Sequence, residues 1–189
     1  MKVSREQARL NRAHVVEVAG AEFRRHGFDG IGVADLMKAA GLTHGGFYGN
    51  FASKDDLAAE ASARAIAETT NVIAEQLAGA KDPLAAFVEL YLSPEHRDHI
   101  AEGCVLAALA ADAARGSPAL HRAFEQGVDD YLALLTPLSP GETEPARRQA
   151  AMATVATAVG ALVLSRTVAD PALSDAILAT AGDRIRNQR

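Results

Sequence analysis

Apolar residues recur at spacings of three and four along most of the chain, which is the pattern of amphipathic helices. The first such stretch begins after Ser4 and ends at Gly27, and the second, VADLMKAAG, ends at Gly41. A third, short helix is predicted from His44 to Asn50, and a long fourth helix from Ser53 to about residue 77. No stretch shows the alternation of a strand, so the chain is predicted to be all-α.

Further helix starts are marked by a polar residue followed by proline, which suits the first turn of a helix. Another short helix is predicted directly after Gly103, and a Gly- and Pro-rich loop at 136–145 precedes two final helices at 145–166 and 171–186. The sequence therefore predicts about nine helices. We expect a three-helix head, residues 1–53, and a helical bundle, residues 54–189. The marked starts are Asp82-Pro83, Ser117-Pro118, Glu144-Pro145 and Asp170-Pro171.

Composition restricts the possible classes of protein. Of the 189 residues, 49% are hydrophobic, which is enough for a core. No apolar run reaches the roughly 20 residues of a membrane span, and the charged start of the chain does not resemble a signal peptide. The single cysteine, Cys104, cannot form an internal disulfide. These features predict a cytoplasmic protein without a membrane partner.

The net charge of −5 is unevenly distributed. Residues 1–54 carry +3 and residues 55–189 carry −8. A basic head on an acidic body is what a protein that binds a polyanion through its N-terminus requires. Chance fluctuation is the alternative, because +3 is modest.

Residues 41–57, GLTHGGFYGNFASKDDL, concentrate glycines and aromatics between helical stretches. A helix, an Ala-Gly-Leu turn and a short second helix form the order of a helix-turn-helix, which binds in the major groove of duplex DNA. Glycines in the second helix would let the backbone approach DNA closely. The predicted DNA-binding residues are Thr43, His44, Gly45, Gly46, Tyr48, Lys54 and Arg12.

Several of these assignments have a simpler alternative. Tyr48 could pack in the core with its hydroxyl in solvent, and Lys54 could be a solvated surface lysine. Arg12 competes with Arg5 and Arg9 for the same phosphate contact. Nearby aromatics, Phe47 and Phe51, are expected in the core of the head.

At this point the sequence resembles the TetR/AcrR family of bacterial transcriptional regulators. The family's turn, second helix and following helix start correspond to AGLT at 40–43, GFYGNF at 46–51 and KDDL at 54–57. The resemblance covers about residues 5–60. It departs from the family pattern at Gly32, Gly49 and Asn50, where the family often has a hydroxyl, a longer side chain and His or Tyr.

The resemblance implies a homodimer that binds a near-palindromic DNA operator, with a variable ligand pocket in the body. It also implies a dimer interface on the last two long helices, and the alternative is that these helices pack only internally. The predicted interface residues are Ala158, Leu162, Leu173 and Ile177. The predicted pocket residues, which could equally be core, are Phe87, Tyr91, Phe124, Val128 and Tyr131.

Cys104 follows Gly103 at the start of a predicted helix, which resembles a branch of the family that senses electrophiles or oxidants. A helix N-terminus stabilises a thiolate. The alternative is an inert, buried cysteine. His96 and His99, in the segment EHRDH at 95–99, could suggest a metal site, but Pro94 favours a charged loop, and we expect neither a metal nor a cofactor.

The sequence therefore predicts a transcriptional repressor that responds to a small-molecule ligand or to thiol modification by an electrophile. The alternative is a dimeric small-molecule-binding protein whose head has lost operator recognition. No nucleophile–base pair, phosphate loop or metal cluster stands out, so we do not expect an enzyme.

Overall fold

A computed structural model describes residues 4–188, and these form nine α-helices, two 3-10 turns and no strands. The predicted all-α fold class is confirmed. In chain order the elements are α1 (Arg5–His26), α2 (Val33–Ala39), η1 (His44–Gly46), α3 (Lys54–Ala78), α4 (Pro83–Tyr91), α5 (Pro94–Asp98), α6 (Val105–Ala113), α7 (Pro118–Leu135), η2 (Thr136–Leu138), α8 (Glu144–Thr167) and α9 (Pro171–Arg186).

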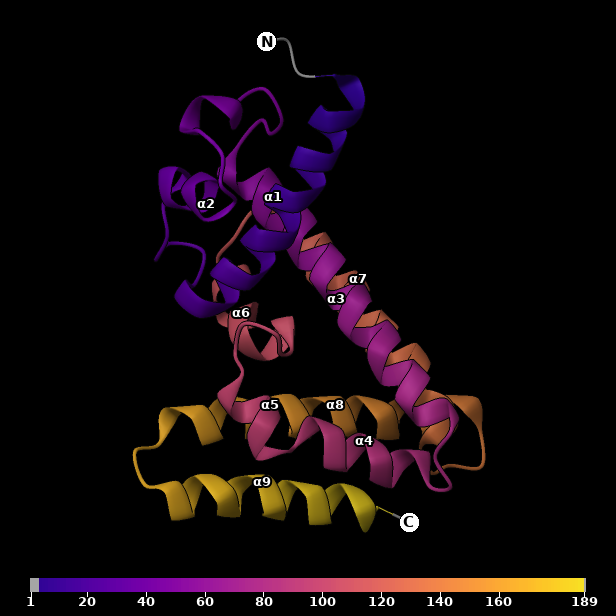
Figure 1. Ribbon diagram of the computed structural model, residues 1–189. Coiled ribbons are helices and arrows are strands. Elements are labelled where there is room, and N and C mark those ends of the chain that lie inside the picture. Colours follow the sequence, from indigo (N-terminus) through magenta and orange to yellow (C-terminus); the bar gives the residue numbers. More distant parts are fainter. Residues whose placement is uncertain (1–3, 189) are drawn as a thin grey trace.

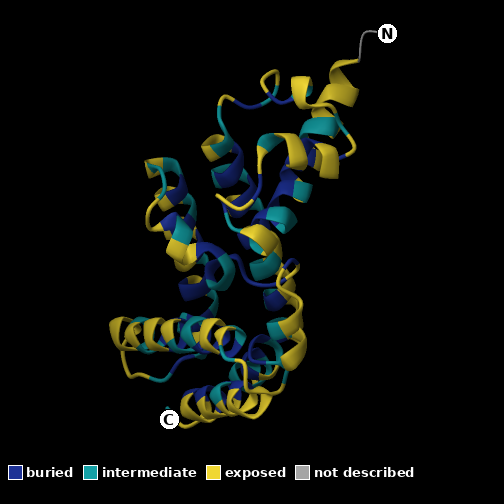
Figure 2. Cartoon of the chain, turned by 90° about the vertical axis from the view of Figure 1, so that its left-hand side faces the viewer, coloured by how far each residue is buried: buried dark blue, intermediate teal, exposed yellow. Residues whose placement is uncertain are grey.

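The helices form a small head and a larger body joined by one long helix (Figure 1). The head contains α1, α2 and η1, and α3 begins beside them and runs down into the body, where α7 packs along it. Helices α4, α8 and α9 lie across the far end of the molecule. Buried positions face the junctions between these layers, and the outer helix faces are exposed (Figure 2).

Most α-helices begin at a side-chain oxygen that accepts a hydrogen bond from a first-turn amide. Such caps typically contribute about 1 kcal/mol each. The predicted starts at Ser4, Ser53, Asp82, Ser117 and Asp170 are confirmed, whereas α8 is capped by Thr143, one residue before the predicted Glu144. Local sequence therefore determines where these helices start.

Two predictions of local structure were wrong. The predicted helix from His44 to Asn50 is only a 3-10 turn, η1, followed by further turns, because glycines at 45, 46 and 49 destabilise a continuous helix by about 1 kcal/mol each. The predicted loop at 94–98 is a short helix, α5, in which Ser93 caps the first turn and Pro94 occupies it.

The head has its own apolar core, in which Phe23, Leu36, Met37, Phe47 and Phe51 are at most 4% exposed. In the body, α3 lies close to α7 at Gly127, where a Cβ would lie 2.7 Å from Ile66 Cδ1. The long helix α3 contributes to both cores, so the head is held on a rigid element of the body.

Helix α8 is the one helix in residues 4–188 that is long and apolar enough to cross a membrane by length and composition. A core helix in a bundle needs the same composition. Here α8 packs along α9 and contacts α7, and its inner positions Ala151, Ala158 and Leu162 are buried within the chain.

Candidate DNA-binding surface and effector pocket

The turn between α2 and the recognition segment, defined here as residues 43–50, depends on Gly41. Its φ of +68° lies in the left-handed region that favours glycine. Two backbone hydrogen bonds close the turn, from Gly41 N to Lys38 O at 2.9 Å and from Leu42 N to Met37 O at 2.8 Å. The turn directs the chain away from α2 and onto the outer surface of the head.

The recognition segment exposes most of the predicted DNA-binding residues. Thr43, His44 and Gly45 are exposed, and Tyr48 is 69% exposed although its ring packs edge-on against Phe47 at 5.2 Å. Gly46 and Lys54 are half-buried. Because packing against Phe47 fixes the Tyr48 ring, its exposed hydroxyl can contact a partner without a change of conformation.

The protein's own packing does not require glycine at position 45. A Cβ there would meet nothing within 4 Å, and its φ is not positive. Glycine disfavours helical structure, and no neighbouring atom of the chain excludes a Cβ at position 45. The space at this position is therefore explained by a binding partner and not by internal packing. Close approach of another molecule to this backbone is the simplest explanation.

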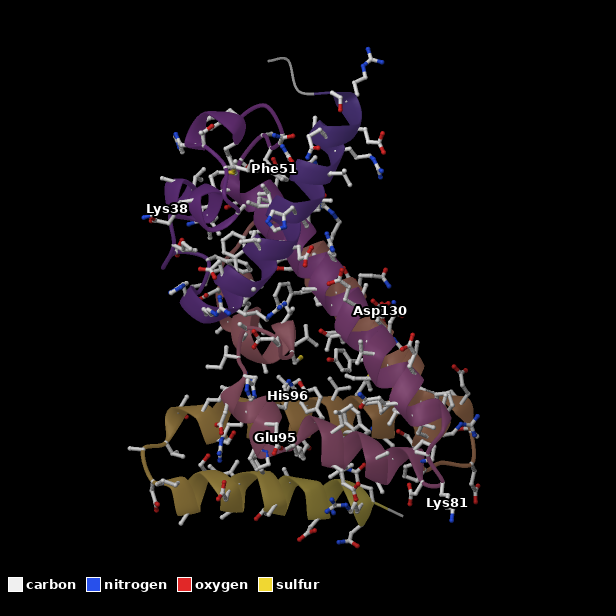
Figure 3. The ribbon with its side chains drawn as sticks, in the orientation of Figure 1. Lys38, Phe51, Lys81, Glu95, His96 and Asp130 are labelled. Carbon is white, nitrogen blue, oxygen red and sulfur yellow. The ribbon has the colours of Figure 1, made fainter. Side chains whose placement is uncertain are left out.

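Arg12 has a structural partner that the sequence did not reveal. Its guanidinium makes two hydrogen bonds to the Glu60 carboxylate, at 2.5 and 2.6 Å, and donates a third to Asn50 O at 3.3 Å. It also lies over the ring of Phe51, 4.8 Å from the centroid. Figure 3 shows Phe51 in the head. The hydrogen bonds to Glu60 raise the pKa of Arg12. These contacts join α1, α3 and the recognition segment, and they count against the predicted phosphate contact.

We expect Arg12→Ala to lower the free energy of unfolding by about 1 kcal/mol, because the paired side chains are both about 40% exposed and solvent weakens their attraction. Glu60→Gln should have a similar effect, and the double variant should lose less than the sum, as measured by urea denaturation. A smaller salt dependence of DNA binding in Arg12→Ala, with stability unchanged, would instead support the phosphate contact.

A pocket of about 450 Å³, called here the junction pocket, opens between the head and the body. Its lining is mostly apolar. Arg24 of the head helix α1 forms part of the wall, so a ligand here would touch the head directly. The lining residues are Arg24, Ala65, Glu68, Thr69, Val72, Ile73, Leu90, Tyr91, Ser93, Glu95, His96, His99, Glu102 and Gly103.

The five predicted pocket residues do not form one pocket. Only Tyr91 lines the junction pocket, while Phe124 and Val128 line a separate apolar groove of about 620 Å³ between α6, α7 and α8. Phe87 and Tyr131 line neither and are at most 2% exposed. The stacked rings of Phe87 and Tyr91, with centroids 5.2 Å apart, and the edge contact of Tyr91 with Tyr131 fill the space between the central helices.

Cys104 lies behind the wall of the junction pocket and is 1% exposed. It is the residue that precedes α6, as predicted, but its side chain accepts no hydrogen bond from the helix. Its amide donates to His96 Nε2 at 2.9 Å, and the Tyr131 hydroxyl donates to its Sγ at 3.4 Å. The thiol is therefore buried but surrounded by polar groups.

His96 connects α4, α5 and α6. Its Nδ1 lies 2.7 Å from the Tyr91 carbonyl, which can only accept, so Nδ1 carries the proton and Nε2 is free to accept from Cys104 N. Burial lowers the pKa of His96, against the opposing effect of the Tyr91 carbonyl. Gly103 makes the contact possible, since a Cβ there would lie 2.8 Å from His96 Cδ2. Figure 3 places His96 and Glu95 together on α5.

The arrangement gives no metal site within residues 4–188, where no three His, Cys, Asp or Glu side chains come together to hold an ion. His96 is directed inward and uses both ring nitrogens in hydrogen bonds to the backbone. His99 Nδ1 instead meets Glu95 O at 2.8 Å.

The lowered pKa of His96 has a defined effect on stability. In the unfolded chain His96 takes up a proton near pH 6.5, and in the folded chain it does so only at lower pH. The contribution of neutral His96 to folding stability is therefore complete above about pH 6.5 and is lost as the pH falls below it. We expect His96→Gln, which cannot protonate, to lose less stability between pH 7.5 and 5.5 than the wild type does, as measured by urea denaturation. Equal losses would contradict a neutral, hydrogen-bonded His96.

Two of the predicted dimer-interface residues are inside the chain. Ala158 and Leu162 are 1% and 0% exposed because they lie on the inner face of α8. Leu173 is 48% exposed and Ile177 is half-buried, so these two remain accessible. The outer face of α8 instead exposes Met152, Val163 and Leu164.

Comparison with known proteins supports the assignment of the head. Residues 15–61 match the family described as "Bacterial regulatory proteins, tetR family". This range includes α2, the turn and the recognition segment. No protein in the curated set matches the chain in sequence.

The fold of the whole chain is shared with solved structures of regulators. The reduced form of E. coli NemR has a TM-score of 0.79 at 22% identity, covering 94% of this chain and 95% of that one. A TetR-family transcriptional regulator from Cytophaga hutchinsonii has a TM-score of 0.80 at 21% identity, with 98% and 97% covered. A TetR transcriptional regulator from Chloroflexus aurantiacus has a TM-score of 0.79 at 24% identity, with 97% and 98% covered.

The helix-turn-helix geometry, the family match over that geometry and the shared fold of the whole chain lead to one conclusion. Residues 15–61 form a DNA-binding helix-turn-helix of the family described as "Bacterial regulatory proteins, tetR family", and the whole chain has the fold of solved TetR-family regulators.

Proposed function

We propose that the protein is a homodimeric transcriptional repressor that binds a near-palindromic operator and releases it when an effector occupies the body. The observation that carries this proposal is the exposed recognition segment, in which Thr43, His44 and Tyr48 surround a glycine that internal packing does not need. Two such heads about 34–36 Å apart would reach successive major grooves of B-DNA.

In this mode of docking, α2 braces the recognition segment while the segment lies in the major groove. Thr43 and His44 would face base edges, and the Tyr48 hydroxyl and Lys54 would hold phosphates. The missing side chain at Gly45 would let the backbone approach the DNA. Asn50, which departs from the family pattern, donates through Nδ2 to Gly46 O at 2.7 Å and so supports the segment from within.

The dimer would form through the outer faces of α8 and α9. Met152 is 47% exposed, Leu164 is 55% exposed and Leu173 is 48% exposed, and together with Val163 and Ile177 they give these two helices an apolar surface. Two-fold pairing of such surfaces would build a four-helix interface.

The junction pocket is the proposed effector site because Arg24 and Glu102, which take part in contacts between head and body, line it. The Arg24 guanidinium donates through Nε to Ala101 O, and Arg25 lies 3.6 Å from Glu102. Phe28 N donates to Asp112 of α6 at 3.4 Å. A ligand that moves this wall would change the angle of the head, with a coupling free energy of typically about 1–3 kcal/mol.

The proposal is tested by selecting bound duplexes from a random DNA library with the purified protein. We expect enrichment of one near-palindromic sequence whose half-sites are centred about one helical turn apart. Uptake of small apolar molecules without enrichment of any sequence would favour the alternative, a dimeric ligand-binding protein with a degenerate head.

A further inference from the structure

Two side chains that line the junction pocket carry a buried polar group without a hydrogen-bond partner in residues 4–188. These groups are Nη1 of Arg24 and the hydroxyl of Tyr91. Tyr91 is 1% exposed, and its ring is held by stacking on Phe87. Buried polar groups in folded proteins are almost always satisfied, so donors left over on the wall of a pocket indicate an acceptor that a ligand supplies.

Arg24 has the larger unused capacity of the two. A guanidinium carries five N–H donors and no acceptor, and within the described part of the chain only the Nε–H of Arg24 has an acceptor, the Ala101 carbonyl. Burial lowers the pKa of Arg24, and the charge of Glu102 opposes that effect. A lowered pKa means that the surroundings stabilise the charged guanidinium less than water does. An added negative charge would therefore be favourable here.

The guanidinium can be approached from two sides. Arg24 also lines a smaller pocket of about 240 Å³ between α1 and α3, and both pockets share Ala65, Glu68 and Glu102. Nη1 lies toward the smaller pocket, since a Cβ at Gly20 would be 3.9 Å from it. A carboxylate has two oxygens whose spacing matches two N–H groups of a guanidinium. Such a group at the boundary of the two pockets would satisfy the free donors of Arg24.

The rest of the junction pocket requires an apolar body on the ligand. Ala65, Ile73 and Leu90 line it, and Val72 is 52% exposed beside them. The volume of about 450 Å³ falls within the range of roughly 300–1,000 Å³ that is typical of ligand pockets. A molecule with an apolar body and one acidic group would use both parts of the site.

Three carboxylates around the pocket, those of Glu68, Glu95 and Glu102, would favour a cation instead. All three residues are exposed, so solvent weakens their effect. Glu68 pairs with Arg64 at 2.7 Å, and Glu102 lies 3.6 Å from Arg25. A buried charge is screened much less than an exposed one. The buried guanidinium therefore determines the sign of the ligand, and the carboxylates around it disfavour a second negative charge.

We propose that the junction pocket binds an organic monocarboxylate with an apolar body, whose carboxylate accepts hydrogen bonds from the Arg24 guanidinium. This inference rests on the proposed function, because it names the chemical class of the effector. Arg24 belongs to α1 of the head, and its Nε holds the Ala101 carbonyl of the body. A carboxylate that engages the guanidinium therefore acts directly on a contact between head and body.

The test compares octanoate, octanol and octylamine, which share one chain and differ in charge. Their binding to the full-length protein is measured by calorimetry. We expect octanoate to bind most tightly and octylamine least tightly. Arg24→Met should weaken octanoate binding by about 10- to 100-fold, the effect of a hydrogen bond to a charged group, and change octanol binding little.

Two further arginine variants control for folding and for overall charge. Arg24→Lys keeps the positive charge and should recover part of the octanoate affinity. Arg148 pairs with Asp129 at 2.8 Å and does not line the junction pocket, so Arg148→Met should bind octanoate as the wild type does. Equal octanoate affinity in the wild type, Arg24→Met and Arg148→Met would overturn the proposal.

Removal of a neighbouring carboxylate separates an anion site from a cation site. Glu102→Gln should strengthen octanoate binding by about two- to threefold, because an exposed like charge is lost. If octylamine binds most tightly and Glu102→Gln weakens it, the pocket is a cation site and the proposal is wrong. Binding of neither octanoate nor 2-naphthoate, a flat monocarboxylate, would also overturn it.

Two truncations locate the bound chain. Leu90→Ala should weaken octanoate and octanol alike, by about fivefold, because both lose the same apolar contact. Val128 lines the separate groove between α6, α7 and α8, so Val128→Ala should change neither affinity. The reverse result would place the ligand in that groove and contradict the proposed site.

DNA binding is measured separately on the same proteins. Octanoate binding that depends on Arg24, in a protein without DNA affinity, would support the carboxylate site and contradict the proposed function. DNA binding by a protein that binds neither carboxylate would overturn the site and leave the proposed repressor in place.

Discussion

Replacing Leu162 by alanine is expected to lower the free energy of unfolding by about 2–5 kcal/mol. Leu162 is 0% exposed on the inner face of α8, so truncation leaves a cavity against the body. The family resemblance implied that this residue belongs to a dimer interface. The structure assigns it to the core of one protomer.

Leu164, two residues later and 55% exposed, is the matched control. Leu164→Asp should leave the protomer folded and weaken self-association, as measured by sedimentation and by urea denaturation at two protein concentrations. A folded but monomeric Leu162→Ala variant would return Leu162 to the interface and contradict the packing described above.

Replacing Gly45 by leucine should abolish most DNA binding without destabilising the protein. A Cβ at position 45 would meet nothing within 4 Å in the free chain, and replacing a helical glycine is favourable by up to about 1 kcal/mol. On DNA, the same side chain would hold the backbone away from the groove. We expect affinity to fall by about 100-fold, on the order of 1.4 kcal/mol for each head of a dimer.

Gly79 provides the control for this substitution. It also has open space around its Cβ position and a negative φ, but it lies at the far end of α3. Gly79→Leu should change neither the melting temperature nor DNA affinity by much. If Gly45→Leu binds DNA as well as Gly79→Leu does, position 45 does not face the groove.

The boundaries of most helices could be predicted because capping residues and prolines next to each boundary determine where the helix begins. Ser53 and Asp170, for example, cap the helices that follow them. The recognition segment was predicted to contain a short helix from His44 to Asn50, but its glycines limit it to a single 3-10 turn. Helix α5 was missed because Pro94 suggested a loop, although proline fits the first turn of a helix.

The contacts of the site could not be predicted because they join residues distant in sequence. The pairing of Arg12 with Glu60 spans 48 positions, and nothing near Arg12 distinguishes it from Arg5 or Arg9. Periodicity identified the apolar residues of α8 but not which face meets the body, so the assignment of Ala158 and Leu162 was wrong. The hydrogen bond from Tyr131 to Cys104 depends on how α7 meets the start of α6, 27 positions earlier in the chain.

Binding of operator DNA by the head is best tested through its salt dependence. Affinity for duplex DNA from upstream of the protein's own gene is measured across salt concentrations for the wild type, Lys54→Gln and Lys81→Gln. Lys81 is exposed at the opposite end of the molecule from the head (Figure 3). We expect steeply salt-dependent binding, with a slope reduced by about 2 in Lys54→Gln, one for each head of the dimer, and unchanged in Lys81→Gln. No binding by the wild type at low salt, or equal slopes in all three proteins, would contradict it.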